Sequence, residues 1–92
     1  MSLVDHITCD EIRSAREILR SVHNEHGIRL WEMRSDSRLA HYVRARHRTY
    51  YELYNTLTPT GRKRSLSEIA RQFRRHPSTV LKGIKKHQDD GS

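Results

Sequence analysis

Residues 65–87 read SLSEIARQFRRHPSTVLKGIKKH, and this stretch decides the fold. Ser65 followed by Glu68 is a capping box, a pattern in which each side chain accepts the other residue's backbone N–H at the start of a helix. We therefore expect a helix to begin at Ser65. The apolar side of this helix is predicted from residues at helical spacing, namely Ile69, Ala70 and Phe73.

A second helix is expected to follow at once. Residues 74–76 interrupt the apolar pattern, and Pro77 suits the first turn of a new helix, where its missing N–H costs nothing. The buried side of this helix is expected from Val80, Leu81 and Ile84. Two short helices joined by a tight turn form a helix-turn-helix, whose second helix enters the major groove of DNA.

Length and composition favour one small all-α domain. The chain has 92 residues, of which 34% are hydrophobic and 32% charged, and its apolar positions recur at helical spacing. Two prolines and four glycines supply few turns for a β-rich fold. We expect a domain of about four to five helices at residues 8–88, a lead at residues 1–7 and a polar tail at residues 89–92.

Several classes of function find no support in the sequence. Cys9 is the only cysteine, so no internal disulfide can form. No apolar run approaches the ~20 residues that cross a bilayer and no signal peptide is visible, so we expect a cytoplasmic, nucleoid-associated protein without membrane contact. His23 and His26 lack further ligands at metal-binding spacing. We expect no enzyme activity, no cofactor, no metal and no small-molecule ligand.

Positive charge is concentrated in the part of the chain that holds the helix-turn-helix. Residues 1–33 carry four arginines and six acidic residues, which gives a net charge of −2. Residues 34–88 carry fourteen basic and three acidic residues, which gives +11. A basic segment that coincides with a groove-reading motif is typical of a protein that binds double-stranded DNA. The alternative is a solvated basic face.

Two further helices and a short connecting element are expected before the helix-turn-helix. Thr8 and Glu11 form another capping box, so the first helix is expected to begin near Cys9 and to stop at Gly27. Trp31 is expected to plug the core from a short helix or turn. A long helix is expected over residues 38–57, with its N-cap among residues 35–37. The expected buried residues of the long helix are Leu39, Val43, Tyr50, Leu53 or Tyr54, and Leu57.

The helix-turn-helix predicts roles for its polar and basic residues. Bases are read by the exposed start of the second helix, where the candidates are His76, Pro77, Ser78, Thr79 and Lys82. Helix N-termini and the cations beside them bind phosphates, which gives affinity and register. The phosphate candidates are Arg44, Arg48, Arg62, Lys63, Arg64, Ser65, Arg74, Arg75 and Lys85. For Ser78 and Thr79 the alternative is helix capping alone.

From about residue 12 to residue 88 the chain resembles the C-terminal DNA-binding domain of the bacterial replication initiator DnaA. Three segments carry the resemblance: HGIRLWEMRSDSR, VRARHRTYYEL and SLSEIARQFRRHPSTVLKGIKKH. The family signature reads Gly-Gly-Arg-Asp-His-Thr-Thr-Val after a phenylalanine, and here Phe73 is followed by RRHPSTV. The resemblance implies an all-α, Trp-repressor-like helix-turn-helix domain that binds double-stranded DNA.

The turn departs from the family pattern. It is one residue shorter and lacks the glycine pair. His76 stands where the family has Asp, and Pro77 stands where the family has its base-contacting His. Ser78, Thr79 and Val80 keep the Thr-Thr-Val character. No Walker-type phosphate loop is present, so we expect the chain not to be a complete initiator.

Arg46 interrupts the apolar stripe of the long helix, and such an interruption is a place to look for function. In the resembling family an arginine at this position enters the minor groove beside the major-groove site, and the resemblance implies that role for Arg46. The alternatives are a phosphate contact and an ion pair with an acid such as Glu52.

Three functions fit these observations. The first is a transcription regulator of phage-like origin, or the DNA-binding module of a larger regulator. The second is the DNA-binding domain of a replication initiator. The altered turn and the missing ATPase domain favour the first of these. The third belongs to another class: a protein–protein adaptor on a helix-turn-helix scaffold, whose first helix would contact a partner protein or form a dimer.

Overall fold

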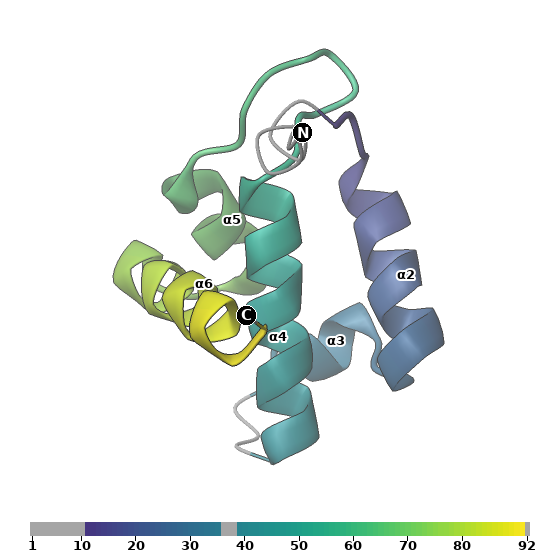
Figure 1. The fold of residues 1–92 in the computed structure, drawn as a ribbon, viewed down its shortest axis with the longest axis vertical. Coiled ribbons are helices and arrows are strands. Elements are labelled where there is room, and N and C mark those ends of the chain that lie inside the picture. Colours follow the sequence, from purple (N-terminus) through teal and green to yellow (C-terminus); the bar gives the residue numbers. More distant parts are fainter. Residues whose placement is uncertain (1–10, 36–38, 92) are drawn as a thin grey trace.

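The structure, a computed structural model, describes residues 11–35 and 39–91. Along the chain lie helices α2 (Ala15–His26), α3 (Leu30–Met33), α4 (Ala40–Tyr54), α5 (Leu66–Phe73) and α6 (Pro77–Gly91). α4 stands at the centre, with α2 packed on one side and the α5–α6 pair on the other (Figure 1). The described residues form an all-α domain with a helix-turn-helix, which confirms the predicted fold class.

Both helices of the helix-turn-helix begin where the sequence predicts. The Ser65 hydroxyl accepts the N–H of Glu68 (3.1 Å), and the Glu68 carboxylate accepts the N–H of Ser65 (3.0 Å). α6 begins at Pro77. Of the apolar residues expected to be buried in α5 and α6, only Leu81 is exposed, at 37%. Leu81 follows Val80 around the helix and so lies off the face that packs on the core.

The turn between α5 and α6 forces one arginine into an unusual backbone conformation. Arg74 ends α5 with φ 57° and ψ 46°, in the left-handed region. The N–H of Arg75 then reaches back to the carbonyl of Ala70 (2.8 Å), the long bond of a Schellman motif. Glycine is the usual residue here, because a Cβ in this conformation crowds the next carbonyl at a cost of about 1–2 kcal/mol.

Two arginines fix this turn against the segment between α3 and α4. Arg34 Nε donates to the carbonyl of Gln72 (2.9 Å) near the end of α5. In the opposite direction, Arg75 Nη2 donates to the carbonyls of Arg34 (3.3 Å) and Ser35 (2.5 Å). We call these contacts the Arg34–Arg75 clamp. The clamp supplies charged hydrogen-bond donors to three backbone carbonyls and ties the turn to the body of the domain.

α4 and α6 approach closely because α6 has a glycine at the crossing. Tyr50 of α4 is buried, and its ring meets Phe73 of α5 edge-on with centroids 5.3 Å apart. On α6, Gly83 faces the rings of His47 and Tyr50 so closely that a Cβ atom would lie 2.8 Å from His47 Cδ2 and 2.9 Å from Tyr50 Cδ2. This packing therefore requires a residue without a side chain at position 83.

The first described helix begins later than predicted. Residues 11–14 are not helical: Arg13 N–H donates to the carbonyl of Leu57 (2.9 Å), and Leu57 N–H donates to the carbonyl of Glu11 (2.8 Å). α2 instead starts after Ser14, which forms its own capping box with Glu17. The predicted start near Cys9 is therefore wrong, although Thr8 and Cys9 themselves lie outside the described residues. The predicted stop at Gly27 is confirmed, with φ 69°.

The segment before α4 also differs from the prediction. Trp31 is 67% exposed, whereas Ile28 and Met33 on either side of it are buried, so Trp31 does not plug the core. Leu39, expected in the core, is 58% exposed and is the N-cap of α4. Of the residues expected to cap α4, Ser35 donates instead to the carbonyl of Glu32 (2.6 Å), and residues 36 and 37 lie outside the described residues.

The buried face of α4 is only partly the predicted stripe. Its buried residues are Ala45, Thr49, Tyr50 and Leu53. Tyr54 is 40% exposed, so the open choice between positions 53 and 54 is decided for leucine. Val43 and Leu57 are half-buried. α4 ends at Tyr54, before the predicted end at residue 57.

We predict that Gly83→Ala destabilises the domain by about 1–3 kcal/mol, because the added methyl group overpacks the α4–α6 crossing. At an exposed helix position the same change would stabilise by up to about 1 kcal/mol. Urea unfolding measures the difference, with Lys82→Ala, one residue earlier and exposed, as the control. A Gly83→Ala protein as stable as the wild type would show that the crossing is not close-packed.

Candidate nucleic-acid interface

The start of α6 is exposed, as a base-reading helix requires. His76, Ser78, Thr79 and Lys82 are exposed, and Pro77 is half-buried. The carbonyl of His76 accepts the N–H of Thr79 (2.9 Å), which makes His76 the N-cap residue of α6. The His76 ring completes the cap, because its Nδ1 accepts the N–H of Ser78 (3.1 Å). Capping is therefore done by His76, and the side chain of Thr79 is not the cap.

Arg62 is held by an acid of the same motif. Its two terminal nitrogens contact the two carboxylate oxygens of Glu68 at 2.7 and 2.9 Å. The same carboxylate caps the N–H of Ser65 (3.0 Å). The pairing with Arg62, together with the hydrogen bond from Ser65, lowers the pKa of Glu68 from 4.5 to about 2. The charge of Arg62 is offset by this pair, but its guanidinium keeps further N–H donors at the surface.

Arg64 points into the fold. Only 7% of it is exposed, and its guanidinium donates to the carbonyls of Leu53 (3.2 Å) and Arg13 (2.6 Å) and to the hydroxyl of Thr56 (3.0 Å). Burial lowers the pKa of Arg64. Leu53 and Thr56 lie at the C-terminal end of α4, where carbonyls lack helical partners and the helix dipole favours a cation. Arg64 thus caps the end of α4.

Arg48 is also engaged inside the domain. It contacts Glu25 of α2 (2.7 Å) and Glu52, one turn further along α4 (2.6 Å). Glu52 in turn pairs with Arg13 (2.6 Å). The hydrogen bond to Glu25 is the largest of the causes that raise the pKa of Arg48. Arg48 therefore joins α4 to α2, on the side of α4 away from the helix-turn-helix (Figure 1).

Two further candidate cations, Arg75 and Arg46, are half-buried. Arg75 belongs to the Arg34–Arg75 clamp. Arg46 of α4 is half-buried. Burial raises the pKa of Tyr50, and the charges of Arg75 and Arg46 act against that rise. In the described residues Glu52 pairs with Arg13 and Arg48, and no ion pair joins it to Arg46.

The other phosphate candidates are exposed. They come from three parts of the chain: the first half of α4, the loop before α5, and the turn and helix that follow. They are Arg44, Lys63, Ser65, Arg74 and Lys85. Lys86, which the sequence predicts to meet the DNA backbone together with Lys85, is exposed as well. Arg71 of α5 is also exposed and was not predicted as a site residue.

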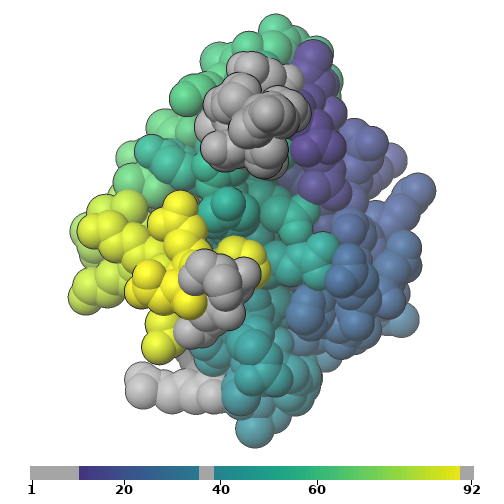
Figure 2. Space-filling model, viewed as in Figure 1, coloured from purple at the N-terminus to yellow at the C-terminus, as the bar shows by residue number. Residues whose placement is uncertain are grey.

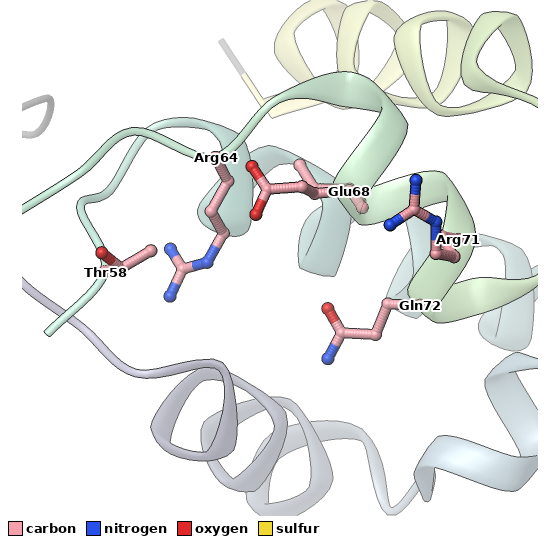
Figure 3. A pocket seen from close by; sticks show the side chains of 6 residues that line it. Thr58, Arg64, Glu68, Arg71 and Gln72 are labelled. Atoms are coloured by element: carbon pink, nitrogen blue, oxygen red, sulfur yellow. The ribbon is translucent and has the colours of Figure 1, made fainter. Parts of the chain in front are cut away.

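A shallow hollow of about 290 Å³ lies between α5 and the loop before it (Figure 3). Its lining residues are Thr58, Arg64, Glu68, Ile69, Arg71 and Gln72. Five of these six residues have polar or charged side chains, among them two arginines and one glutamate. Within residues 11–35 and 39–91, no group of three or more His, Cys, Asp or Glu side chains could hold a metal ion. In the same residues no helix has the length and apolar character needed to cross a membrane.

A helix-turn-helix whose second helix, α6, is capped and exposed at its start and packs on a central long helix is the arrangement of a class of DNA-binding proteins. The family model described as "Bacterial dnaA protein helix-turn-helix" matches residues 15–86. The chain belongs to this family, as its resemblance predicts, and membership implies DNA binding. Neither curated proteins nor solved structures give a significant match to the chain.

We predict that Glu68→Gln lowers stability at neutral pH and removes a pH dependence. Because folding lowers the pKa of Glu68 from 4.5 to about 2, its stabilising effect is full above pH 4.5 and disappears as the pH falls toward 2. The urea midpoints of the wild type and of Glu68→Gln, measured between pH 7 and pH 2, should therefore differ most at pH 7 and converge in acid. Arg62→Gln should remove part of the same dependence, since the Ser65 bond remains. Parallel curves for wild type and Glu68→Gln would contradict this account.

Proposed function

We propose that this protein binds a specific double-stranded DNA sequence and regulates transcription in association with the nucleoid. The start of α6 lies in the major groove, and Arg46 reaches the adjacent minor groove. One observation carries the proposal: α6 presents an exposed polar first turn on a frame held rigidly by the core and by the Arg34–Arg75 clamp. A rigid support is what a base-reading helix needs, because small displacements break its hydrogen bonds.

The phosphate contacts come from the exposed cations. Lys63 and Ser65 stand at the N-terminus of α5, and Arg74 and Lys85 belong to the turn and to α6, while Arg44 extends from α4. Arg48, Arg64 and Arg75 serve the fold instead, because each donates to acceptors within the chain. Four exposed cations on phosphates would give a log–log salt slope of about −4.

The bases are read by His76, Ser78, Thr79 and Lys82, with Pro77 fixing the start of the helix. Thr79 can place its methyl group against that of thymine, and Lys82 can reach guanine O6 or N7. Both side chains are exposed on α6. Arg46 lies on α4 rather than on α6, so it can approach the duplex at a second place. Arginine is favoured in narrow A·T-rich minor grooves because negative potential is strongest there.

The role in transcription rests on the altered turn. Arg74, Arg75, His76 and Pro77 stand in place of the family's Gly-Gly-Arg-Asp-His, so the bound sequence is expected to differ from the initiator's own site. A replication-initiator DNA-binding domain is the second candidate. Selection of bound duplexes from a random pool separates the two, because an initiator-like site would favour replication.

The experiment that tests DNA binding is titration of the full chain with labelled duplexes at several salt concentrations. We expect binding that weakens steeply with salt and a selected site bound more tightly than random DNA. The surface of α2 lies on the other side of the molecule from α6 (Figure 2), so a protein partner there would leave duplex binding intact. Absence of binding to any duplex at low salt would end the proposal and favour the adaptor.

We predict that Arg74→Gly stabilises the fold but weakens DNA binding. Glycine removes the strain of the left-handed conformation, for a gain of up to about 1 kcal/mol. Loss of one phosphate contact reduces the salt slope by about 1. Urea unfolding and salt-dependent titration measure the two effects, and Arg74→Lys, which keeps both charge and strain, should change neither. A variant that binds as tightly as the wild type with the same slope would remove Arg74 from the interface.

We predict that Arg46→Ala lowers the affinity for sites with A·T-rich flanks more than for other sites, by about tenfold, because the arginine in the narrow minor groove is lost. Titration of duplexes that share the selected site and differ only in their flanks measures the effect. Arg44→Ala, an exposed change on the same helix, is the matched control and should weaken all duplexes alike. Equal losses on every flank for Arg46→Ala would assign Arg46 to the backbone instead.

A further inference from the structure

His76 and Ser78 form a small hydrogen-bonded unit at the first turn of α6. The N–H of Ser78 donates to Nδ1 of His76 (3.1 Å), and the Ser78 hydroxyl oxygen lies 2.8 Å from the same nitrogen. Both side chains are exposed. The second ring nitrogen, Nε2, takes no part in this unit.

The backbone N–H fixes the tautomer of the ring. A backbone N–H can only donate, so Nδ1 of His76 must present its lone pair to Ser78. In the neutral ring the proton then sits on Nε2. Because Nδ1 carries no proton, the Ser78 hydroxyl must be the donor in its 2.8 Å contact, and its oxygen keeps lone pairs for another partner.

We infer that His76 and Ser78 are a specificity-determining pair of fixed polarity, with His76 Nε2–H as a donor and Ser78 Oγ as an acceptor. This inference rests on the proposed function, because it requires the start of α6 to face the bases. The matching partner is a base edge that carries an acceptor beside an amino group. Adenine offers both on one edge, with N7 as acceptor and N6 as amino group. We therefore assign adenine to the position beneath the pair.

The polarity depends on histidine being the N-cap residue. A carboxylate at position 76 would cap the N–H of Ser78 equally well, since Asp is a strong N-cap residue. It would present only acceptors to the groove, and acceptors pair with amino groups such as cytosine N4. His76→Asp therefore keeps the N-cap of α6 and replaces the hydrogen-bond donor at position 76 with an acceptor. It is a matched variant because only the polarity at this position changes.

The first test is nuclear magnetic resonance of the free protein. Long-range ¹H–¹⁵N correlations within the His76 ring should show Nε2 protonated and Nδ1 unprotonated. The second test is selection from a random duplex pool, followed by replacement of the selected adenine with 7-deazaadenine, which lacks N7 but keeps the amino group.

The replacement should weaken wild-type binding about tenfold and leave His76→Asp unaffected. His76→Asp should move the preference at that position toward cytosine, and Ser78→Ala should lose discrimination against bases without an amino group. Far-UV circular dichroism checks that both variants remain helical.

Two outcomes would overturn the inference while duplex binding stands. One is a ring protonated at Nδ1, and the other is an unchanged base preference in His76→Asp. If the wild type binds no duplex at low salt, the proposed function fails and the inference fails with it, whatever the tautomer. The arms of the experiment therefore separate failure of the pair from failure of DNA binding.

Discussion

The close approach of α6 to α4 at Gly83 is the constraint on which the rest of the structure depends. Because Gly83 has no side chain, the Tyr50 ring can lie against the backbone of α6. The same ring meets Phe73 of α5 edge-on, so one residue of α4 positions both helices of the helix-turn-helix. α6 is thus oriented by the core, and the Arg34–Arg75 clamp holds the turn before it against the same body.

Much of the helix-turn-helix could be predicted because its signals are local. The Ser65–Glu68 box and Pro77 act within one helical turn, and the structure places both as expected. The first helix shows the limit of such signals. Ser14 and Glu17 form as good a capping box as the one predicted earlier in the chain. The helix begins after Ser14 because the backbone of Leu57 pairs with residues 11–13 and holds them in a non-helical arrangement. A contact so distant in sequence leaves no local pattern.

The arginines of the candidate site show a second limit. The sequence gives the number of these charges but does not show where each guanidinium group lies. Arg62 and Arg64 are two residues apart in one basic loop, yet one pairs with Glu68 at the surface and the other is buried at the end of α4. The exposed start of α6 was predictable because Pro77 fixes where the helix begins. The cap by the His76 ring was not, because histidine is an uncommon N-cap residue.

Arg64 has a consequence for the rate at which the domain meets a polyanion. Among the described residues it forms no ion pair with a carboxylate, whereas the charge of Arg62 is locally cancelled by Glu68. A fixed charge that forms no ion pair contributes to the field around the molecule over a Debye length of about 8–10 Å. Such a field speeds diffusional encounter without any direct contact. A buried cation that caps a helix can thereby add to the attraction between the domain and DNA.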